Sequence, residues 1–196
     1  MSRLPVTGHL LAMLLAVCTA LCTSSPAAAT VTGITTADHV SAGNWHSCAL
    51  LANDTVKCWG SNSNGQMGGL VPSYATSPVT VGGLSGVTPI SAGTWHTCAL
   101  IAKGAIRCWG DNGHGELGNG TAGTSFNRTP LPVAGITGAT RVAAGLAGTC
   151  ALLAGGTVKC WGYGLVGGLG NGSTKDSRIP VGVTGVTGAT QLAAGI

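Results

Sequence analysis

Three pairs of cysteines are the residues whose type and spacing most directly indicate chemistry in this chain. The members of each pair lie ten residues apart: Cys48 and Cys58, Cys98 and Cys108, Cys150 and Cys160. Such pairs can form disulfides or bind a metal ion. Zinc sites use the closer Cys-x-x-Cys spacing, and the histidine that precedes the first two pairs is absent from the third. The pattern therefore favours three disulfides, and we expect no metal site.

Short apolar runs flank a turn between the two cysteines of each pair, as at Asn53–Asp54 in the first copy. This pattern predicts a β-hairpin. Folding the first copy symmetrically about Asn53 places Leu50 opposite Val56 and Cys48 opposite Cys58. Directly opposed residues have α-carbons about 4.5–5.5 Å apart, which a disulfide can span. Each disulfide is therefore expected to lie within one hairpin.

Two histidines, His46 and His96, stand two residues before a cysteine. A functional interpretation would make them bases or ligands. No acid or nucleophile accompanies them, and they recur together with the scaffold. We therefore expect each to make a structural hydrogen bond, and hold the functional interpretation as the alternative.

The remaining composition excludes several functional classes. The chain has five acidic residues, with no paired carboxylates and no nucleophile triad, so we expect neither an enzyme nor a cofactor. The formal net charge is +4 and no run of Lys and Arg appears, which argues against nucleic-acid binding.

The first 29 residues resemble an export signal. Arg3 is followed by an apolar run, Leu10–Leu21, that is too short to span a bilayer. Small residues at Pro26–Ala29 then offer a cleavage site. We expect residues 1–29 to be a signal peptide, and the mature protein to be secreted or periplasmic with no membrane association. That compartment is oxidising and favours the three disulfides.

The segment that carries each cysteine pair is a repeat. Copies start near residues 41, 91 and 143, and a fourth begins at 193. The spacing is 50, 52 and 50 residues, measured at Gly43, Gly93, Gly145 and Gly195. A fixed period in this range predicts a repeat architecture. The 34 glycines and a charged fraction of 7% indicate an all-β protein with many turns.

Both faces of the predicted hairpin are apolar. Cys48 and Leu50 fall on one face, together with their opposed partners, whereas Ala49, Leu51 and Trp59 fall on the other. A sheet with this pattern is buried on both sides. In a β-propeller each blade is sandwiched between two neighbours, which meets that requirement.

The recurring motifs Ala-Gly-x-x-His-x-Cys-Ala-Leu, Val-x-Cys-Trp-Gly and Asn-x-x-Gly-x-Leu-Gly resemble the repeat of the regulator of chromosome condensation family. The resemblance covers nearly all of residues 31–196 and implies a propeller of four-stranded antiparallel blades, usually seven. Paired cysteines are a variant of its exported bacterial members. The third repeat departs, with Ala147 for the Trp, Gly148 for the His and Gly164 for the loop Asn. The repeat residues that we expect to be structural are Gly43, His46, Trp59, Gly93, His96, Trp109, Gly145 and Trp161.

Residues 30–196 would supply about three blades and a stub, roughly half of a seven-bladed ring. An open array of blades would expose apolar end faces. We therefore expect either that the sequence is part of a longer propeller or, if the chain is complete, that it self-associates to complete a ring.

Two groups of residues are candidates for partner binding. The loops after Trp59, Trp109 and Trp161 are the expected contact surface, and the longest of them carries Phe126 and Arg128. Basic residues also recur at one place in each copy. Their alternative role is to cover apolar neighbours with their stems while the charge stays in water. This second group is Lys57, Arg107 and Lys159.

The predicted function is a non-catalytic module that binds an unknown protein partner. Secreted propellers similar to this chain include inhibitors of β-lactamases, so the resemblance also implies enzyme inhibition as a specific form of that function. One alternative is guanine-nucleotide exchange on a small GTPase with chromatin binding, against which the export signal argues. Another is an adhesive or spacer part of a longer secreted protein.

Overall fold

Strands account for nearly all the regular structure in residues 31–123 and 125–195, which are the residues that the computed structural model describes. The predicted signal peptide, residues 1–29, lies outside them. The strands are β1 (Ala37–Ala42), β2 (His46–Leu51), β3 (Val56–Ser61), β4 (Tyr74–Thr80), β5 (Ile90–Ala92), β6 (His96–Ile101), β7 (Ala105–Gly110), β8 (Asn127–Pro132), β9 (Ala139–Ala144), β10 (Gly148–Leu153), β11 (Val158–Gly162) and β12 (Ser177–Gly182). Two single 3₁₀ turns, η1 (Ala102–Gly104) and η2 (Leu165–Gly167), complete the elements.

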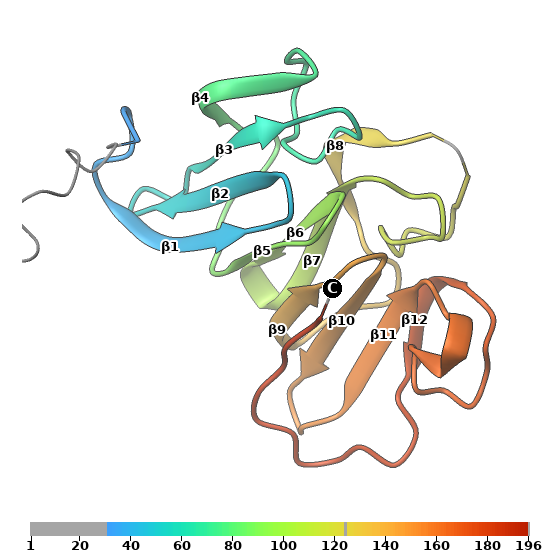
Figure 1. Ribbon diagram of the computed structural model, residues 1–196. Coiled ribbons are helices and arrows are strands. Elements are labelled where there is room, and N and C mark those ends of the chain that lie inside the picture. Colours follow the sequence, from blue (N-terminus) through green and yellow to red (C-terminus); the bar gives the residue numbers. More distant parts are fainter. Residues whose placement is uncertain (1–30, 124, 196) are drawn as a thin grey trace, which may run out of the picture. The chain divides into compact units, whose positions relative to one another are not determined.

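The strands form three four-stranded antiparallel sheets, each in simple sequential order (Figure 1). We name them blade 1 (β1 to β4), blade 2 (β5 to β8) and blade 3 (β9 to β12). This arrangement confirms the predicted all-β class and the four-stranded blades. Blade 2 lies between the other two, as the colours in Figure 1 show.

The central hairpin of each blade has the predicted register. Cys48 pairs with Cys58 and Leu50 pairs with Val56 across β2 and β3. The equivalent pairings recur in β6 and β7 and in β10 and β11. The structure holds all three disulfides, one within each hairpin. A turn residue with positive φ closes each hairpin, for example Asp54 with φ of 62°.

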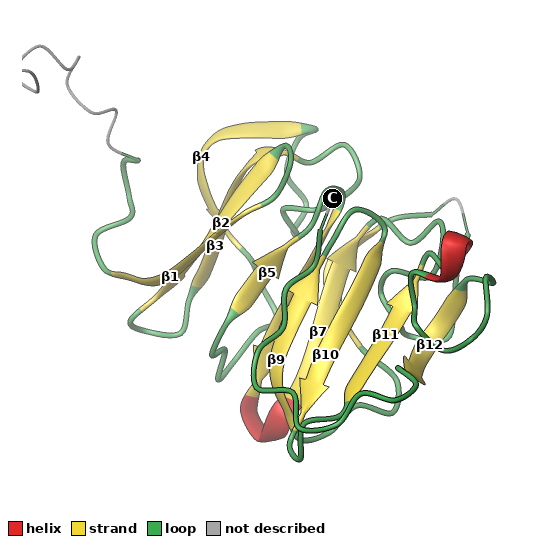
Figure 2. Cartoon of the chain, turned by 60° about the horizontal axis from the view of Figure 1, so that its bottom comes forward, coloured by secondary structure: helices red, strands yellow, loops and turns green. Residues whose placement is uncertain are grey.

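Neighbouring blades pack face to face (Figure 2), and the two faces in contact carry different side chains. The disulfide face carries the cystine and the apolar residues beside it, such as Leu50 and Val56 in blade 1. The tryptophan face of the next blade covers it with Ala99 and Trp109. Blade 2 repeats the contact with blade 3, whose Trp161 is likewise fully buried. Blade 2, which has a described blade on each side, is thus buried on both faces.

The inner strands of the blades lie beside one another. β1, β5 and β9, together with residues 192–194, line a cavity of about 380 Å³. The Ser41 hydroxyl accepts a hydrogen bond from the Ala92 N–H at 2.9 Å, and Ser91 accepts one from Ala144 at 2.9 Å. Residues 192–194, which form no strand, lie at this cavity beside the inner strands.

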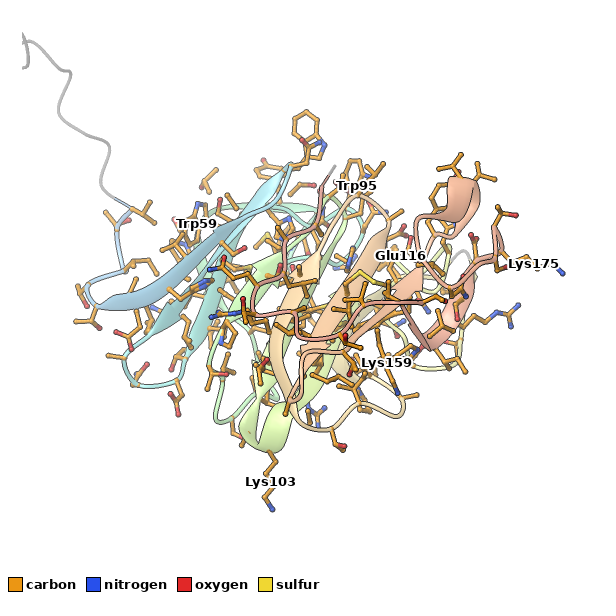
Figure 3. The ribbon with its side chains drawn as sticks, turned by 90° about the horizontal axis from the view of Figure 1, so that it is seen from below. Trp59, Trp95, Lys103, Glu116, Lys159 and Lys175 are labelled. Atoms are coloured by element: carbon orange, nitrogen blue, oxygen red, sulfur yellow. A yellow bond between two sulfur atoms is a disulfide. The ribbon has the colours of Figure 1, made fainter. Side chains whose placement is uncertain are left out.

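Two opposite edges of the blades carry different connections. The antiparallel order brings the turn between the first two strands of a blade beside the loop between its last two strands. In blade 1 the Ser61 N–H donates to the Trp45 carbonyl oxygen at 2.8 Å. We call this the loop edge; its described residues are 43–45, 61–73, 93–95, 111–123, 125–126, 145–147 and 163–176. The turn edge comprises residues 52–55, 102–104 and 154–157. In Figure 3, Trp95 and Lys103 mark the two edges of blade 2.

Gly93 has no room for a side chain. A Cβ there would lie 2.5 Å from the Gly145 carbonyl oxygen and 2.9 Å from the His96 Cε1. Gly93→Ala should therefore lower the free energy of unfolding by about 1–3 kcal/mol, measured by urea denaturation. Gly82→Ala is the matched control, because a Cβ at Gly82 meets nothing within 4 Å. Equal stability of the two variants would contradict the close approach of Gly93 in blade 2 to Gly145 in blade 3.

Candidate interaction surface

A chain of hydrogen bonds joins blade 1 to blade 2. The His46 Nε2 lies 2.7 Å from the Thr97 Oγ1. Thr97 donates its hydroxyl proton to the Gln66 carbonyl oxygen at 2.8 Å, and the Trp109 Nε1–H donates to the same oxygen at 2.9 Å. One loop carbonyl of blade 1 therefore accepts two donors from blade 2. We call this arrangement a seam.

The second seam repeats the first between blades 2 and 3. The His96 Nε2 lies 2.8 Å from the Thr149 Oγ1. The Glu116 carbonyl oxygen accepts from Thr149 at 3.0 Å and from the Trp161 Nε1 at 2.8 Å. The structure thus places both histidines in hydrogen bonds between blades, and the sequence motif gave no indication of their threonine partners.

The hydrogen bonds define which ring nitrogen of each histidine carries the proton. A threonine hydroxyl has one proton, and Thr97 gives it to a carbonyl, so His46 must donate from Nε2–H. Its Nδ1 is buried without a hydrogen-bond partner, as is that of His96. Burial lowers the pKa of His46 to about 4. Burial, with a smaller effect of the nearby His46, lowers the pKa of His96 to about 3. Both rings are neutral at pH 7.

Buried polar side chains fix the shape of the loops that join the third and fourth strands of blades 1 and 2. The Asn62 Oδ1 accepts from the Met67 N–H at 3.0 Å, and the Gln66 Oε1 accepts from the Asn64 N–H at 2.9 Å. In blade 2, Asn112 and Glu116 make the equivalent bonds. Burial raises the pKa of the Glu116 carboxyl, and the backbone N–H groups of Glu116 and His114 oppose that rise.

A second, more exposed contact joins the loops of blades 2 and 3. The His114 Nδ1 lies 2.8 Å from the Asp176 Oδ2, and the His114 ring meets the Tyr163 ring edge-on at 4.7 Å. The Gly164 N–H donates to the Asp176 Oδ1 at 2.9 Å. Partial burial raises the pKa of Asp176, but the Gly164 N–H and His114 outweigh it and the pKa is lowered overall. Sequence reasoning missed this pair, because its members are 62 residues apart and neither recurs.

Phe126 and Arg128 lie against the loop of the preceding blade. The Arg128 Nη1 donates to the Val71 carbonyl oxygen at 2.8 Å, and its guanidinium lies 5.1 Å from the centre of the Phe126 ring. The Gly69 N–H donates to the Arg128 carbonyl oxygen at 2.6 Å. The arginine therefore has an intramolecular partner, while 38% of Phe126 remains exposed.

The three recurring basic residues lie on the third strand of each blade, away from the loop edge. The Lys57 Nζ donates to the Gly33 carbonyl oxygen at 3.1 Å, and the Arg107 Nη1 donates to the Pro130 carbonyl oxygen at 3.1 Å. Lys159, labelled in Figure 3, is half-buried on β11. These contacts are with neighbouring segments of the same chain.

Exposed apolar side chains concentrate on the loop edge. Among the described residues, six of the ten exposed large apolar side chains lie there: Trp45, Leu70, Phe126, Leu146, Leu165 and Val166. Val166 is 90% exposed, and its φ of 57° is a conformation that β-branched residues rarely adopt. Such an exposed, strained apolar tip suggests a role in binding.

Within the described part of the chain, no group of three or more His, Cys, Asp or Glu side chains is arranged to hold a metal ion. No helix there has the length and apolar character needed to cross a membrane.

Comparisons with known proteins agree with the fold. Models of the regulator of chromosome condensation (RCC1) repeat match residues 37–66, 87–116 and 54–100. No curated protein matches the chain.

Two solved structures of Prp20, the RCC1 protein of the yeast Saccharomyces cerevisiae, are similar. One, bound to Kap60, has 22% identity and a TM-score of 0.71 over 78% of this chain and 38% of that one. The other has 21% identity and a TM-score of 0.72 over 83% and 42%.

Human WBSCR16 is also similar, with 21% identity and a TM-score of 0.62 over 82% of this chain and 56% of that protein. This chain therefore spans about two-fifths of the length of the yeast structures, as the coverages of 38% and 42% show.

Acid should destabilise the protein through the two seam histidines. Their pKa values are near 6.5 when unfolded and lower when folded, so below pH 6.5 the unfolded chain binds more protons. The free energy of unfolding should fall by about 1.4 kcal/mol per pH unit for each histidine between pH 6.5 and 4. In urea denaturation at a series of pH values, the free energy of unfolding of His96→Gln should depend less steeply on pH than that of the wild type. The difference should correspond to about one bound proton. An unchanged slope would contradict burial of the neutral ring.

Proposed function

This chain is a protein of the regulator of chromosome condensation repeat family, and from that premise we propose that it is an exported, non-catalytic module that binds a protein partner through its loop edge. The observation that carries the proposal is the unequal distribution of exposed apolar side chains. Six lie on the loop edge, whereas the described residues of the turn edge contribute none. Exposed apolar groups gathered on one face mark interaction sites.

The loops that present these side chains are held in place before any partner arrives. Buried amides of Asn62 and Asn112 bond the loop backbones, and each loop is joined to the next blade by a seam carbonyl. A rigid surface loses little conformational entropy on binding. This supports recognition of a folded partner by a preformed surface.

Export is supported by the three disulfides. Such bonds persist in the periplasm and outside the cell, and are rare in the cytosol. The similar yeast protein is described with Kap60, Gsp1p and histones as partners. For this chain we take from that likeness only that the fold suits protein recognition, because a cytosolic GTPase would not meet an exported protein.

Enzyme inhibition is the specific form of binding that the blade 3 loop favours. The tip Leu165–Gly167 is short and apolar, and both large side chains are exposed. We propose that this tip enters a cleft of the partner, as a wedge that blocks access to it. The neighbouring His114–Asp176 contact ties the base of this loop to blade 2.

Site-specific photocrosslinking tests the proposal. A photoreactive residue at Val166 or Trp45 should crosslink an extracellular protein from the native source, whereas the same residue at Lys103 on the turn edge should not. The captured protein, once purified, should bind the unmodified chain, and Val166→Asp should weaken that binding at least tenfold because a charge would be desolvated. If the captured protein is an enzyme, stoichiometric addition should lower its activity. Crosslinking from Lys103 alone would overturn the proposal.

A further inference from the structure

The charged side chains are distributed unequally between the two halves of the blades. The pairing register places each Lys, Arg, Asp and Glu nearer the turn edge or nearer the loop edge. Among the described residues, the half beside the turn edge holds five basic and two acidic side chains: Lys57, Lys103, Arg107, Arg141, Lys159, Asp38 and Asp54. The half beside the loop edge holds three of each kind: Arg128, Lys175, Arg178, Asp111, Glu116 and Asp176. The excess of positive charge therefore lies wholly beside the turn edge.

Three of the basic residues recur at one place in the blades. They are Lys57, Arg107 and Lys159, and each pairs with the last residue of the outer strand of its blade, β4, β8 or β12. One cation per blade therefore stands where the outer strand ends beside the turn edge. We call these three residues the basic row. Lys103 lies on the turn edge itself, is exposed and projects from it (Figure 3).

The positive charges of the basic row are positioned without being neutralised. The partners of Lys57 and Arg107 are the Gly33 and Pro130 carbonyl oxygens, which carry no net charge. Within the described residues, no lysine or arginine forms an ion pair with an acidic side chain. Each side chain of the row is half-buried, as expected when the stem packs on the protein and the charged group stays in water. An anion can therefore approach the row without displacing an acidic partner.

The turn edge lacks the side chains that usually bind a folded protein or a nucleic-acid base. Its described residues include no aromatic side chain and no exposed large apolar one. Protein interfaces depend on aromatic and apolar anchors, and single-stranded nucleic acids stack on aromatic rings. Charge is thus the property by which this face selects a ligand. Charges that repeat from blade to blade suit a ligand whose own charges also repeat.

We propose that the turn edge binds an anionic polysaccharide through the basic row and Lys103. Carboxylates carried at intervals along the sugar chain pair with the cations of successive blades, and a guanidinium such as that of Arg107 suits the geometry of a carboxylate. Acidic polysaccharides are common polyanions outside cells, so this choice of ligand rests on the proposed export. The opposite, loop edge stays free for a protein partner, and the polysaccharide attaches the module to a surface.

Polygalacturonate, a polymer with one carboxylate per sugar, is the probe that tests the proposal on the purified protein. Fluorescence anisotropy of the labelled polymer should rise on addition of protein at an ionic strength of about 0.01 M. Binding should be lost at about 1 M, because the Debye length falls from about 30 Å to about 3 Å. Neutral dextran of the same length should not bind at either ionic strength.

Two double variants that lose the same charge show which face binds. Lys57→Gln with Lys159→Gln removes two cations from the basic row and should weaken binding about fivefold or more. The matched control, Lys175→Gln with Arg178→Gln, removes two cations from the half beside the loop edge and should change the dissociation constant less than about twofold. Thermal unfolding checks that both variants are folded.

Three results would overturn the proposal. They are a wild-type protein that does not bind polygalacturonate at low salt, an equal loss of binding in the two double variants, and tighter binding to an oligothymidylate of equal charge than to polygalacturonate. The titration involves neither the loop edge nor an extracellular protein. Its failure would therefore leave the photocrosslinking result for the loop edge unaffected, and the two proposals are tested separately.

Discussion

In blades 1 and 2, one carbonyl oxygen in the loop between the third and fourth strands is the group on which the stacking of the blades depends. In blade 1 it belongs to Gln66 and accepts the Thr97 hydroxyl and the Trp109 indole of the next blade. The tryptophan supplies the apolar area of the seam, and the carbonyl satisfies its one polar atom. Because a buried N–H without an acceptor costs about 1–3 kcal/mol, this bond fixes where the large side chain can lie. It therefore also fixes the angle and spacing between blades.

The same loops connect the packing of the blades to the proposed binding surface. Their inner residues hold the seam, and their outer residues, such as Phe126 and Val166, are exposed. Glu116 shows how strictly the inner positions are determined: it is buried and makes with the His114 N–H the bond that Gln66 makes with Asn64 in the first repeat. The outer positions differ from repeat to repeat. A common scaffold thus presents three unlike loops on one edge.

The sequence predicted what depends on local pattern and missed what depends on the rotation between blades. The cysteine spacing and the turn at Asn53–Asp54 determine the hairpin register, and two apolar faces determine that blades stack. The threonine that meets His46 lies 51 residues away on the next blade, and no local pattern points to it. From the sequence, Arg128 was a candidate for binding a partner. In the structure its guanidinium donates to the Val71 carbonyl oxygen, because folding brings the two loops together.

A double-mutant cycle on His96 and Thr149 tests most directly whether the seams hold the blades together. The free energies of unfolding would be measured for His96→Ala, for Thr149→Val and for the double variant. We predict a coupling energy of about 1 kcal/mol or more, because each single change leaves a buried polar group unpaired. Additive effects within about 0.3 kcal/mol would contradict the account, since the two side chains would then stabilise the blades independently.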